Sequence, residues 1–203
     1  MRTLAYIMAL LAFATAAQAQ EQTLIRGSVE HGGFGGPVVK YARVNDQDAV
    51  MVGGRGGWII NHSLALGGGG YGVANDIDAP DEVLSPRGIP ADIEFGYGGF
   101  IMEYIAGSDR LVHFNLNALI GAGGISFREE DDDDGADDNN NWEDGDTVFV
   151  LEPSVNAELN VTAWLRVNLG VSYLMVSGVD KDFLEDSDFS GTTASLTFKF
   201  GTF

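Results

Sequence analysis

Cysteine is absent from the chain, which excludes disulfide bridges, thiol nucleophiles and cysteine-bound zinc. Basic residues are also scarce: 11 Lys and Arg stand against 30 Asp and Glu, so the formal net charge is −19. Such a chain lacks the cations that would neutralise phosphates, and nucleic acid is not expected as a partner. A length of 203 residues suits one domain or a small pair.

Long apolar runs are missing everywhere except at the start. Arg2 precedes an apolar run at 4–16 and a small-residue site at 17–19, the arrangement of a secretory signal peptide. We expect residues 1–19 to be a cleaved signal peptide and 20–203 to form the mature domain. The run is shorter than the roughly 20 residues of a spanning helix, and no later stretch reaches about 18 apolar residues. No helical transmembrane segment is therefore expected.

Two-residue periodicity is what the sequence has in abundance. Within 164–178, for example, Leu165, Val167 and Leu169 alternate with polar or small residues, and strict alternation predicts β-strands. Eight strands are expected, at about 25–44, 49–60, 63–75, 92–106, 111–128, 147–161, 164–178 and 192–203.

The connectors between these segments alternate in length. Those near 61–62, 107–109 and 162–163 are tight, whereas 76–91, 129–146 and 179–191 are long and polar. The first connector, 45–48, is short although it falls on the long-loop side. This alternation predicts an all-β fold, an eight-stranded antiparallel up-and-down barrel with the long loops at one end.

Negative charge concentrates in the connectors at that end. Segment 129–146 alone carries eleven acids and no base. Together with 45–48, 76–88 and 180–188, it accounts for a formal charge of −20, so the rest of the chain nets +1. The expected molecule is a nearly neutral barrel with acidic loops on one rim.

Periodicity alone leaves open which face of the barrel points inward. In a soluble lipocalin-like barrel the apolar face would line a core or ligand site. In a transmembrane barrel it would face lipid, and a charged set would pair inside the lumen: Arg55, Glu152, Glu158, Arg166 and Lys199. The signal peptide and the loop pattern favour the transmembrane barrel. So do aromatic residues near strand ends, which suit interfacial girdles: Trp58, Tyr71, Tyr104, Trp164 and Tyr173.

The final segment, 196–203, ends in Phe203 and resembles the terminal strand of bacterial outer-membrane barrels. In those proteins the assembly machinery reads the terminal aromatic residue, so the resemblance makes that machinery an expected partner. The whole mature chain resembles small eight-stranded outer-membrane proteins of the OmpA-barrel and OmpX type. The glycine clusters at 32–36, 53–57 and 67–72 are similar to those of a Gly-rich family of such barrels with no assigned activity. Unlike OmpA proper, this chain is expected to have no appended periplasmic domain.

The glycine clusters do not form a phosphate-binding loop. None has the GxxxxGK[ST] order, and none leads into a helical pattern. Glycines in strands mark bends and places where bulky neighbours need room. We expect them to thin one wall of the lumen, with Lys40 and Arg55 filling the space.

The acidic segment 129–146 contains weak candidates for a metal site. Glu130, Asp132 and Asp134, followed by Gly135, resemble the first half of a calcium loop, but Asn141 stands where a bidentate Glu is expected. Asp138 is a further candidate ligand. The alternative is a solvated, self-repelling loop. We therefore expect no cofactor, with loosely bound Ca²⁺ as the exception.

Three histidines, at 31, 62 and 113, are the candidates for acid–base chemistry. His62 beside Ser63 suggests a lipid A-modifying enzyme, but the pair lies in a periplasmic turn. His113 lies on the polar, inward face beside Asn115, which indicates a structural role. No enzymatic activity is expected.

The sequence thus predicts a monomeric outer-membrane barrel of the Gram-negative type, with a structural or interaction role at the cell surface. Its expected partners are outer-membrane lipids and lipopolysaccharide. Eight strands enclose a lumen that side chains can fill, so no open pore is expected. A narrow channel, a lipid A-modifying enzyme and a soluble lipocalin-like barrel are the alternatives.

Overall fold

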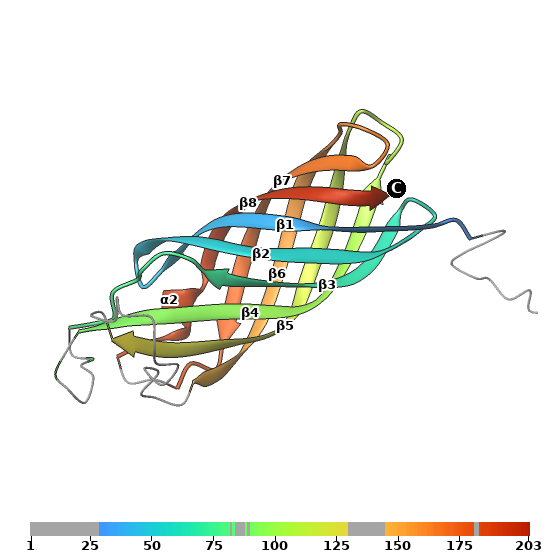
Figure 1. Cartoon of the computed structure of the whole chain (residues 1–203). Helices are drawn as coiled ribbons and strands as arrows, with labels where there is room; N and C mark the ends of the chain where they lie inside the picture. The colour runs from blue at the N-terminus through green and yellow to red at the C-terminus, as the bar shows by residue number, and fades with distance from the viewer. Residues whose placement is uncertain (1–28, 82, 84–87, 89, 130–144, 181–182) are drawn as a thin grey trace, which may run out of the picture.

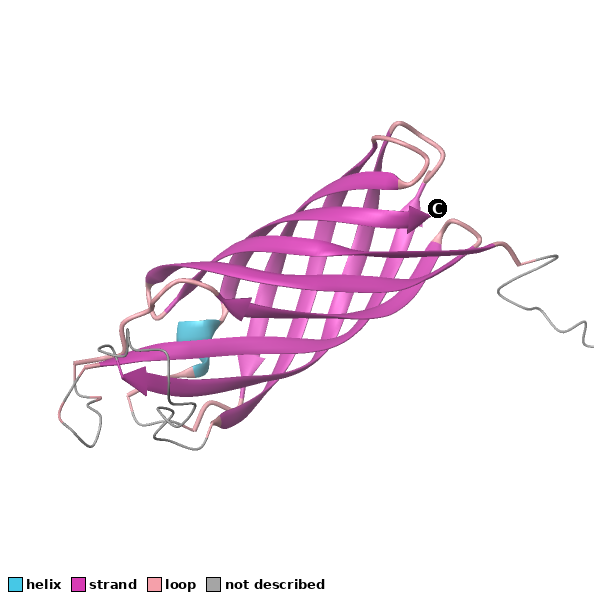
Figure 2. Cartoon of the chain, viewed as in Figure 1, coloured by secondary structure: helices cyan, strands magenta, loops and turns pink. Residues whose placement is uncertain are grey.

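A computed structural model describes residues 29–81, 83, 88, 90–129, 145–180 and 183–203. Eight strands and one short helix make up this part of the chain (Figures 1 and 2). Their bounds are β1 His31–Val44, β2 Gln47–Ile60, β3 Leu64–Val73, β4 Ala91–Ala106, β5 Val112–Glu129, β6 Asp146–Asn160, β7 Leu165–Ser177, α2 Asp186–Phe189 and β8 Gly191–Thr202. The eight predicted strands are confirmed.

The strands close into one barrel in which each pairs with its neighbours in sequence. Closure comes from β1 and β8, whose register runs antiparallel from Gly33 opposite Thr202 to Tyr41 opposite Ala194. Each strand therefore has two partners, so the sheet has no edge. The predicted up-and-down antiparallel topology is confirmed.

The connectors sort to the two ends as the sequence predicts. The start of β1, the C-terminus and the turns after β2, β4 and β6 lie at one end, which we name the turn end (Figure 1). The last residues of β1, β3, β5 and β7 lie at the opposite end, which we name the loop end. Val44 pairs with Gln47 across a two-residue turn in which Asn45 and Asp46 have φ of 48° and 60°. Asn and Asp tolerate this left-handed region, which a tight hairpin with primed geometry requires.

No helix in the described ranges is long and apolar enough to cross a membrane.

Apolar side chains cover the outside of the barrel. In β7 the side chains of Leu169 and Val171 are 62% and 59% exposed, whereas the side chain of Asn168, on the opposite face of the same strand, is fully buried. The same sidedness holds in β5 and β6, where Phe114 and Val155 are exposed and His113 and Asn156 are buried. Periodicity alone left this choice open, whereas other sequence features favoured an outward apolar face, and the structure has the apolar set outward.

The lumen is filled in two layers. Toward the loop end it holds an apolar plug made by strand residues, the connectors and α2. Phe189 of α2 is fully buried and lies 5.1 Å, centroid to centroid, from the ring of Phe95. Toward the turn end most inward side chains are charged or amide-bearing, although Ile59 and Ile105 are also buried there. The apolar plug was not predicted, because its connectors have no two-residue period.

The prediction that Tyr71 belongs to an interfacial girdle is wrong. Tyr71 is only 7% exposed and points into the lumen, where its ring lies 5.4 Å from that of Tyr97. Glycines surround Tyr71 in β3, so the local sequence has no other large side chain to reveal its face. Trp58, Tyr104, Trp164 and Tyr173 are exposed, as predicted.

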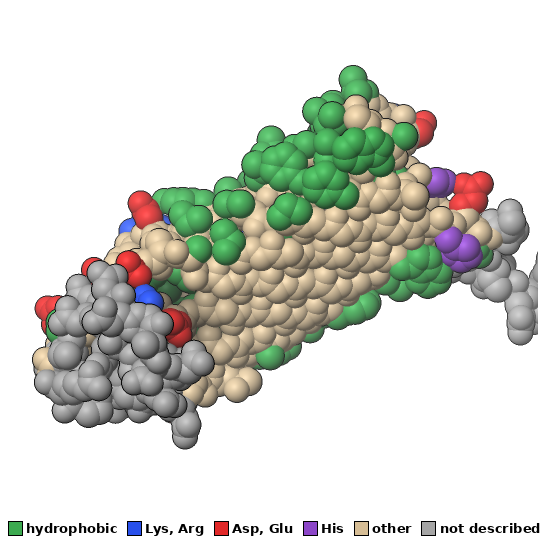
Figure 3. Space-filling view, viewed as in Figure 1, with side chains coloured by type: hydrophobic (Ala, Val, Ile, Leu, Met, Phe, Trp, Pro, Cys, Tyr) green, Lys and Arg blue, Asp and Glu red, His purple; other side chains and the backbone are tan. Residues whose placement is uncertain are grey.

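The glycine clusters give the barrel a smooth outer face. Outward glycines of neighbouring strands lie opposite each other, for example Gly56 beside Gly68 and Gly70 beside Gly98. Figure 3 shows the result as a broad stretch without large side chains across β1 to β3. Inward glycines act differently: a Cβ on Gly67 would fall on the carbonyl oxygen of Gly56.

Replacing Gly67 by alanine is therefore expected to destabilise the barrel by roughly 1–3 kcal/mol, because the backbone of β2 would have to move. The matched control is Gly72→Ala in the same strand, where an added Cβ meets nothing within 4 Å. It should leave stability unchanged or raise it slightly, since alanine restricts the unfolded chain. Urea unfolding in lipid vesicles measures both, and equal effects would contradict the close approach at Gly67.

Candidate functional site

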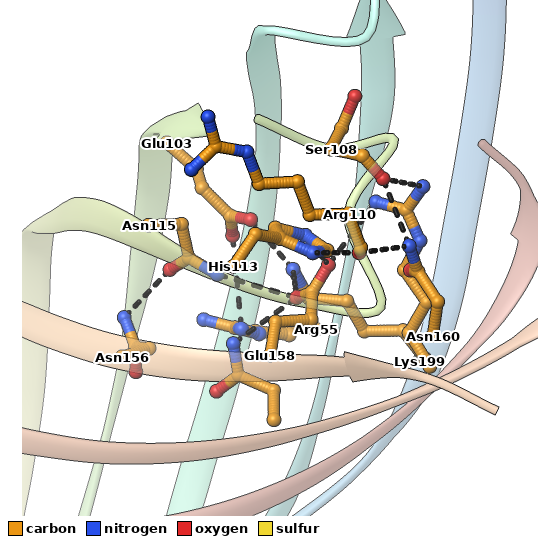
Figure 4. Close-up of polar contacts among 12 residues, drawn as sticks. Arg55, Glu103, Ser108, Arg110, His113, Asn115, Asn156, Glu158, Asn160 and Lys199 are labelled. Atoms are coloured by element: carbon orange, nitrogen blue, oxygen red, sulfur yellow. Dashed lines mark hydrogen bonds and ion pairs between the residues drawn. The ribbon is translucent and has the colours of Figure 1, made fainter. Parts of the chain in front are cut away.

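The most elaborate arrangement of polar side chains is a buried network in the lumen, centred on Glu158 of β6 (Figure 4). Five side chains from β5, β7 and β8 contact its carboxylate. They are Lys199 Nζ at 2.5 Å, His113 Nε2 at 3.1 Å, Asn168 Nδ2 at 3.1 Å, Arg166 Nη1 at 3.2 Å and Asn115 Nδ2 at 3.2 Å. All five residues occupy inward-facing positions in the alternation of their strands, so their side chains meet in the lumen.

Glu103 of β4 joins this network from the opposite wall. Its Oε1 lies 2.5 Å from Lys199 Nζ, and its Oε2 lies 3.6 Å from Arg55 Nη2. All three side chains are at least nine-tenths buried. Lys199 therefore bridges two carboxylates, as expected for charges that must be paired when they leave water.

A second buried cluster lies nearer the middle of the lumen. Lys40 Nζ is 2.6 Å from Glu152 Oε2 and 2.9 Å from the hydroxyl of Tyr97. The ammonium also lies 3.8 Å from the centroid of the Tyr71 ring, a cation–π geometry. Ser172 donates to Glu152 at 2.7 Å. Lys40 and Arg55 thus fill space beside the glycine-rich strands, as predicted.

The turn end carries a cavity of about 530 Å³. Its lining residues are His62, Ser108, Asp109, Asn160, Thr162, Ala163, Arg166 and Phe203. Phe203 continues the inward register of Lys199, and the Arg166 guanidinium carbon lies 4.0 Å from the centroid of its ring. The terminal aromatic side chain therefore covers the charged network at this end, a packing role that was not predicted from the sequence.

His62 and His113 each contact a carboxylate, which fits a structural role. His62 Nε2 lies 2.6 Å from Glu30 Oε2 at the surface of the turn end. His113 is buried, with Nδ1 3.2 Å from the carbonyl oxygen of Arg110 and Nε2 against Glu158. Within the described ranges, neither ring is hydrogen-bonded to a serine hydroxyl. The inward, satisfied position of His113 was predicted.

At the loop end, Arg128 is surrounded by carboxylates. Its guanidinium lies 3.0 Å from Asp76, 3.5 Å from Asp92 and 3.7 Å from Glu94. The described part of the chain contains no group of three or more potential ligands that could hold a metal ion. The predicted calcium candidates Glu130, Asp132, Asp134 and Asp138 lie outside the described residues.

The chain matches no family model and no curated protein sequence. Among solved structures it is similar to Neisserial surface protein A (NspA), at 13% identity and a TM-score of 0.53, over 86% of this chain and 97% of that one. It is also similar to Ail, the attachment invasion locus protein of Yersinia pestis, solved with the heparin analogue sucrose octasulfate. That similarity has 12% identity and a TM-score of 0.50, over 86% of this chain and 99% of Ail. The chain therefore has the eight-stranded antiparallel barrel fold of small outer-membrane proteins.

Proposed function

We propose that this protein spans a bacterial outer membrane as a closed barrel and presents acidic loops at the cell surface for interaction. The observation that carries the proposal is the sidedness of the barrel. Apart from the glycine-rich stretch across β1 to β3, large apolar side chains cover its outside, whereas buried ion pairs occupy the turn-end half of its lumen. Exposing such an apolar surface to water would cost free energy, whereas a barrel in a lipid bilayer needs an apolar outer surface. A soluble lipocalin-like barrel would need the opposite sidedness.

Aromatic side chains support a transmembrane placement. Near the turn end, Trp58, Tyr104 and Trp164 are exposed, and the Trp164 ring stacks on Phe200. Near the loop end, Tyr41 and Tyr173 are exposed. Two such bands flanking an apolar belt fit the two membrane interfaces.

Membrane fractionation with gel electrophoresis tests this placement. The protein should be found in the outer-membrane fraction, and unheated samples should migrate differently from boiled ones because a closed barrel resists detergent. Recovery in the soluble periplasm without a mobility change would contradict the proposal.

The filled lumen supports an anchor rather than the alternative of a narrow channel. Apolar packing around Phe127 and Phe189 covers one half of the lumen, and the Glu158 network occupies the other. In planar bilayers the purified protein should show no discrete conductance, and reproducible conductance steps would favour the channel. We assign the protein no catalytic role, and its expression should leave the mass of lipid A unchanged.

The charge of the loop end limits the class of partner. Ail was solved with a sulfated polyanion, whereas the long connectors of this chain are strongly acidic. Cationic partners, or lipopolysaccharide bridged through divalent cations, fit that charge. The barrel acts as a monomer, and its terminal strand ending at Phe203 is the segment that the assembly machinery engages.

Alanine replacement of residues 131–134 is expected to weaken cation-dependent binding to lipopolysaccharide, because four carboxylates are lost. Calcium titration of the folded protein with lipopolysaccharide vesicles measures the effect. The control replaces Glu30 and Asp109, two acids of the turn end, and should leave binding unchanged. Equal binding by the loop variant and the parent chain would remove this loop from the interaction.

A further inference from the structure

Buried charges in the lumen do not balance. In the part of the chain that the structure describes, four buried cations face three carboxylates there: Lys40, Arg55, Arg166 and Lys199 against Glu103, Glu152 and Glu158. His113 adds no negative charge, and Asp92 lies apart at the loop rim against Arg128. An uncompensated charge in a low-dielectric interior is costly, and proteins normally pair it.

Arg55 is the cation with the weakest pairing. Its Nη2 lies 3.6 Å from Glu103 Oε2, beyond a good hydrogen bond, while Lys199 holds the other oxygen of Glu103 at 2.5 Å. Both Nε and Nη2 of Arg55 are buried without a hydrogen-bond acceptor. Gly69 leaves room for the Arg55 side chain, because a Cβ on Gly69 would lie 2.9 Å from Arg55 Cβ.

Arg55 borders a small cavity of about 20 Å³ inside the lumen. Asn117 also lines the cavity, and its buried Nδ2 lacks an acceptor too. Lys40, Ser195 and Thr197 supply further donors to the same wall. Glu152 is the carboxylate on this wall, and Lys40, Tyr97 and Ser172 already engage it. About 10–15 Å³ suffices for one water-sized sphere, so the cavity has room for one small ligand.

We propose that this cavity binds a single small monovalent anion, chloride in a cellular setting, between Arg55 and Asn117. Glu103 Oε2 is also buried without a hydrogen-bond donor, but Glu103 does not line the cavity. The unpartnered atoms that do line it, on Arg55 and Asn117, are donors, so the site suits a ligand that only accepts hydrogen bonds. One negative charge also brings the lumen to formal neutrality. The anion is a structural part of the folded barrel and does not depend on the proposed surface role.

Refolding into neutral lipid vesicles in sodium chloride or in sodium gluconate tests the site, because gluconate is too large for the cavity. Refolding in each salt is needed since the site is buried. The urea midpoint of the parent chain should be higher in chloride, and it should rise with chloride concentration as for a ligand of the folded state alone. Equal midpoints in the two salts would overturn the proposal.

Two variants separate this site from general salt effects. Asn117→Asp places a carboxylate in the cavity wall, so its midpoint should be the same in both salts. Arg43→Gln removes an arginine that is 61% exposed at the loop end, and it should keep the full chloride effect. Chloride dependence that persists in Asn117→Asp, or that disappears in Arg43→Gln, would overturn the proposal.

Discussion

Replacing Glu158 by leucine is expected to lower the free energy of unfolding by about 3–5 kcal/mol, a large share of the roughly 5–15 kcal/mol that is typical of a folded protein. The carboxylate contacts Lys199, Arg166 and His113 in the lumen. Without it, two buried cations lose a partner and two asparagine side chains lose an acceptor. Urea unfolding in vesicles, followed by tryptophan fluorescence and by gel mobility, measures the loss.

Glu30→Gln is the control for this prediction. Glu30 also pairs with a histidine, at 2.6 Å, but its side chain is 69% exposed. Exposed ion pairs contribute little because water screens them, so the unfolding midpoint should hardly move. If Glu158→Leu were as stable as Glu30→Gln, the lumen network would not be a determinant of the fold.

Placing an arginine at Val171 is expected to destabilise the protein in a bilayer by about 2–4 kcal/mol, the cost of a lipid-facing charge near the midplane of a barrel. Val171 is 59% exposed, at the middle of β7, and is paired across the sheet with exposed Val155. In a barrel surrounded by water the same substitution would change stability by about 0.5 kcal/mol or less. The cost therefore reports on the medium that surrounds the strand.

Ala163→Arg is the matched control for Val171→Arg. Ala163 lies exposed in the turn between β6 and β7 and its side chain makes no hydrogen bond, so an arginine there should leave stability nearly unchanged. Folding yield and urea midpoint in vesicles measure both variants. Equal behaviour of the two arginines would contradict a lipid-facing exterior at Val171.

Strand positions and topology could be predicted from the sequence because alternation is a local signal. In β7 the alternation from Leu165 to Tyr173 assigns both the strand and its two faces. Beyond Tyr173 the signal weakens, since Leu174 and Val176 point inward although Met175 between them is also apolar and outward. Apolar residues on both faces of β7 mark the level of the plug, where the inward side chains are apolar and no longer charged or amide-bearing.

Two aromatic residues show the limit of local reading. Tyr71 lies among glycines, so its face follows only from the register of β3 with β2 and β4. Phe203 was interpreted as a recognition signal, and its inward position follows from counting the alternation past Lys199. Because residues 199, 201 and 203 fall on one face of the alternation that runs through β8, the alternation itself predicts an inward Phe203.

Most charged members of the lumen network could be predicted from the alternation, but Glu103 was not among them, and the pairings could not be predicted. Lys40 and Glu152 are 112 residues apart, and they meet because closure of the barrel brings opposite walls within side-chain reach. Which cation faces which carboxylate depends on strand stagger, which a sequence pattern does not contain. The plug is harder still, because Phe189 comes from a connector with no period at all.

Spin labels on single cysteines provide the most direct test of the central claim, that the apolar outside of a closed barrel faces lipid. The chain has no native cysteine, so a label can be placed separately at Ile120, Val155 and Val171, with Thr162 as the water-exposed reference. In vesicles the first three labels should collide readily with oxygen, which partitions into lipid, and rarely with a water-soluble nickel complex. If the nickel complex reaches them as easily as it reaches Thr162, the outside of this barrel faces water and the account is wrong.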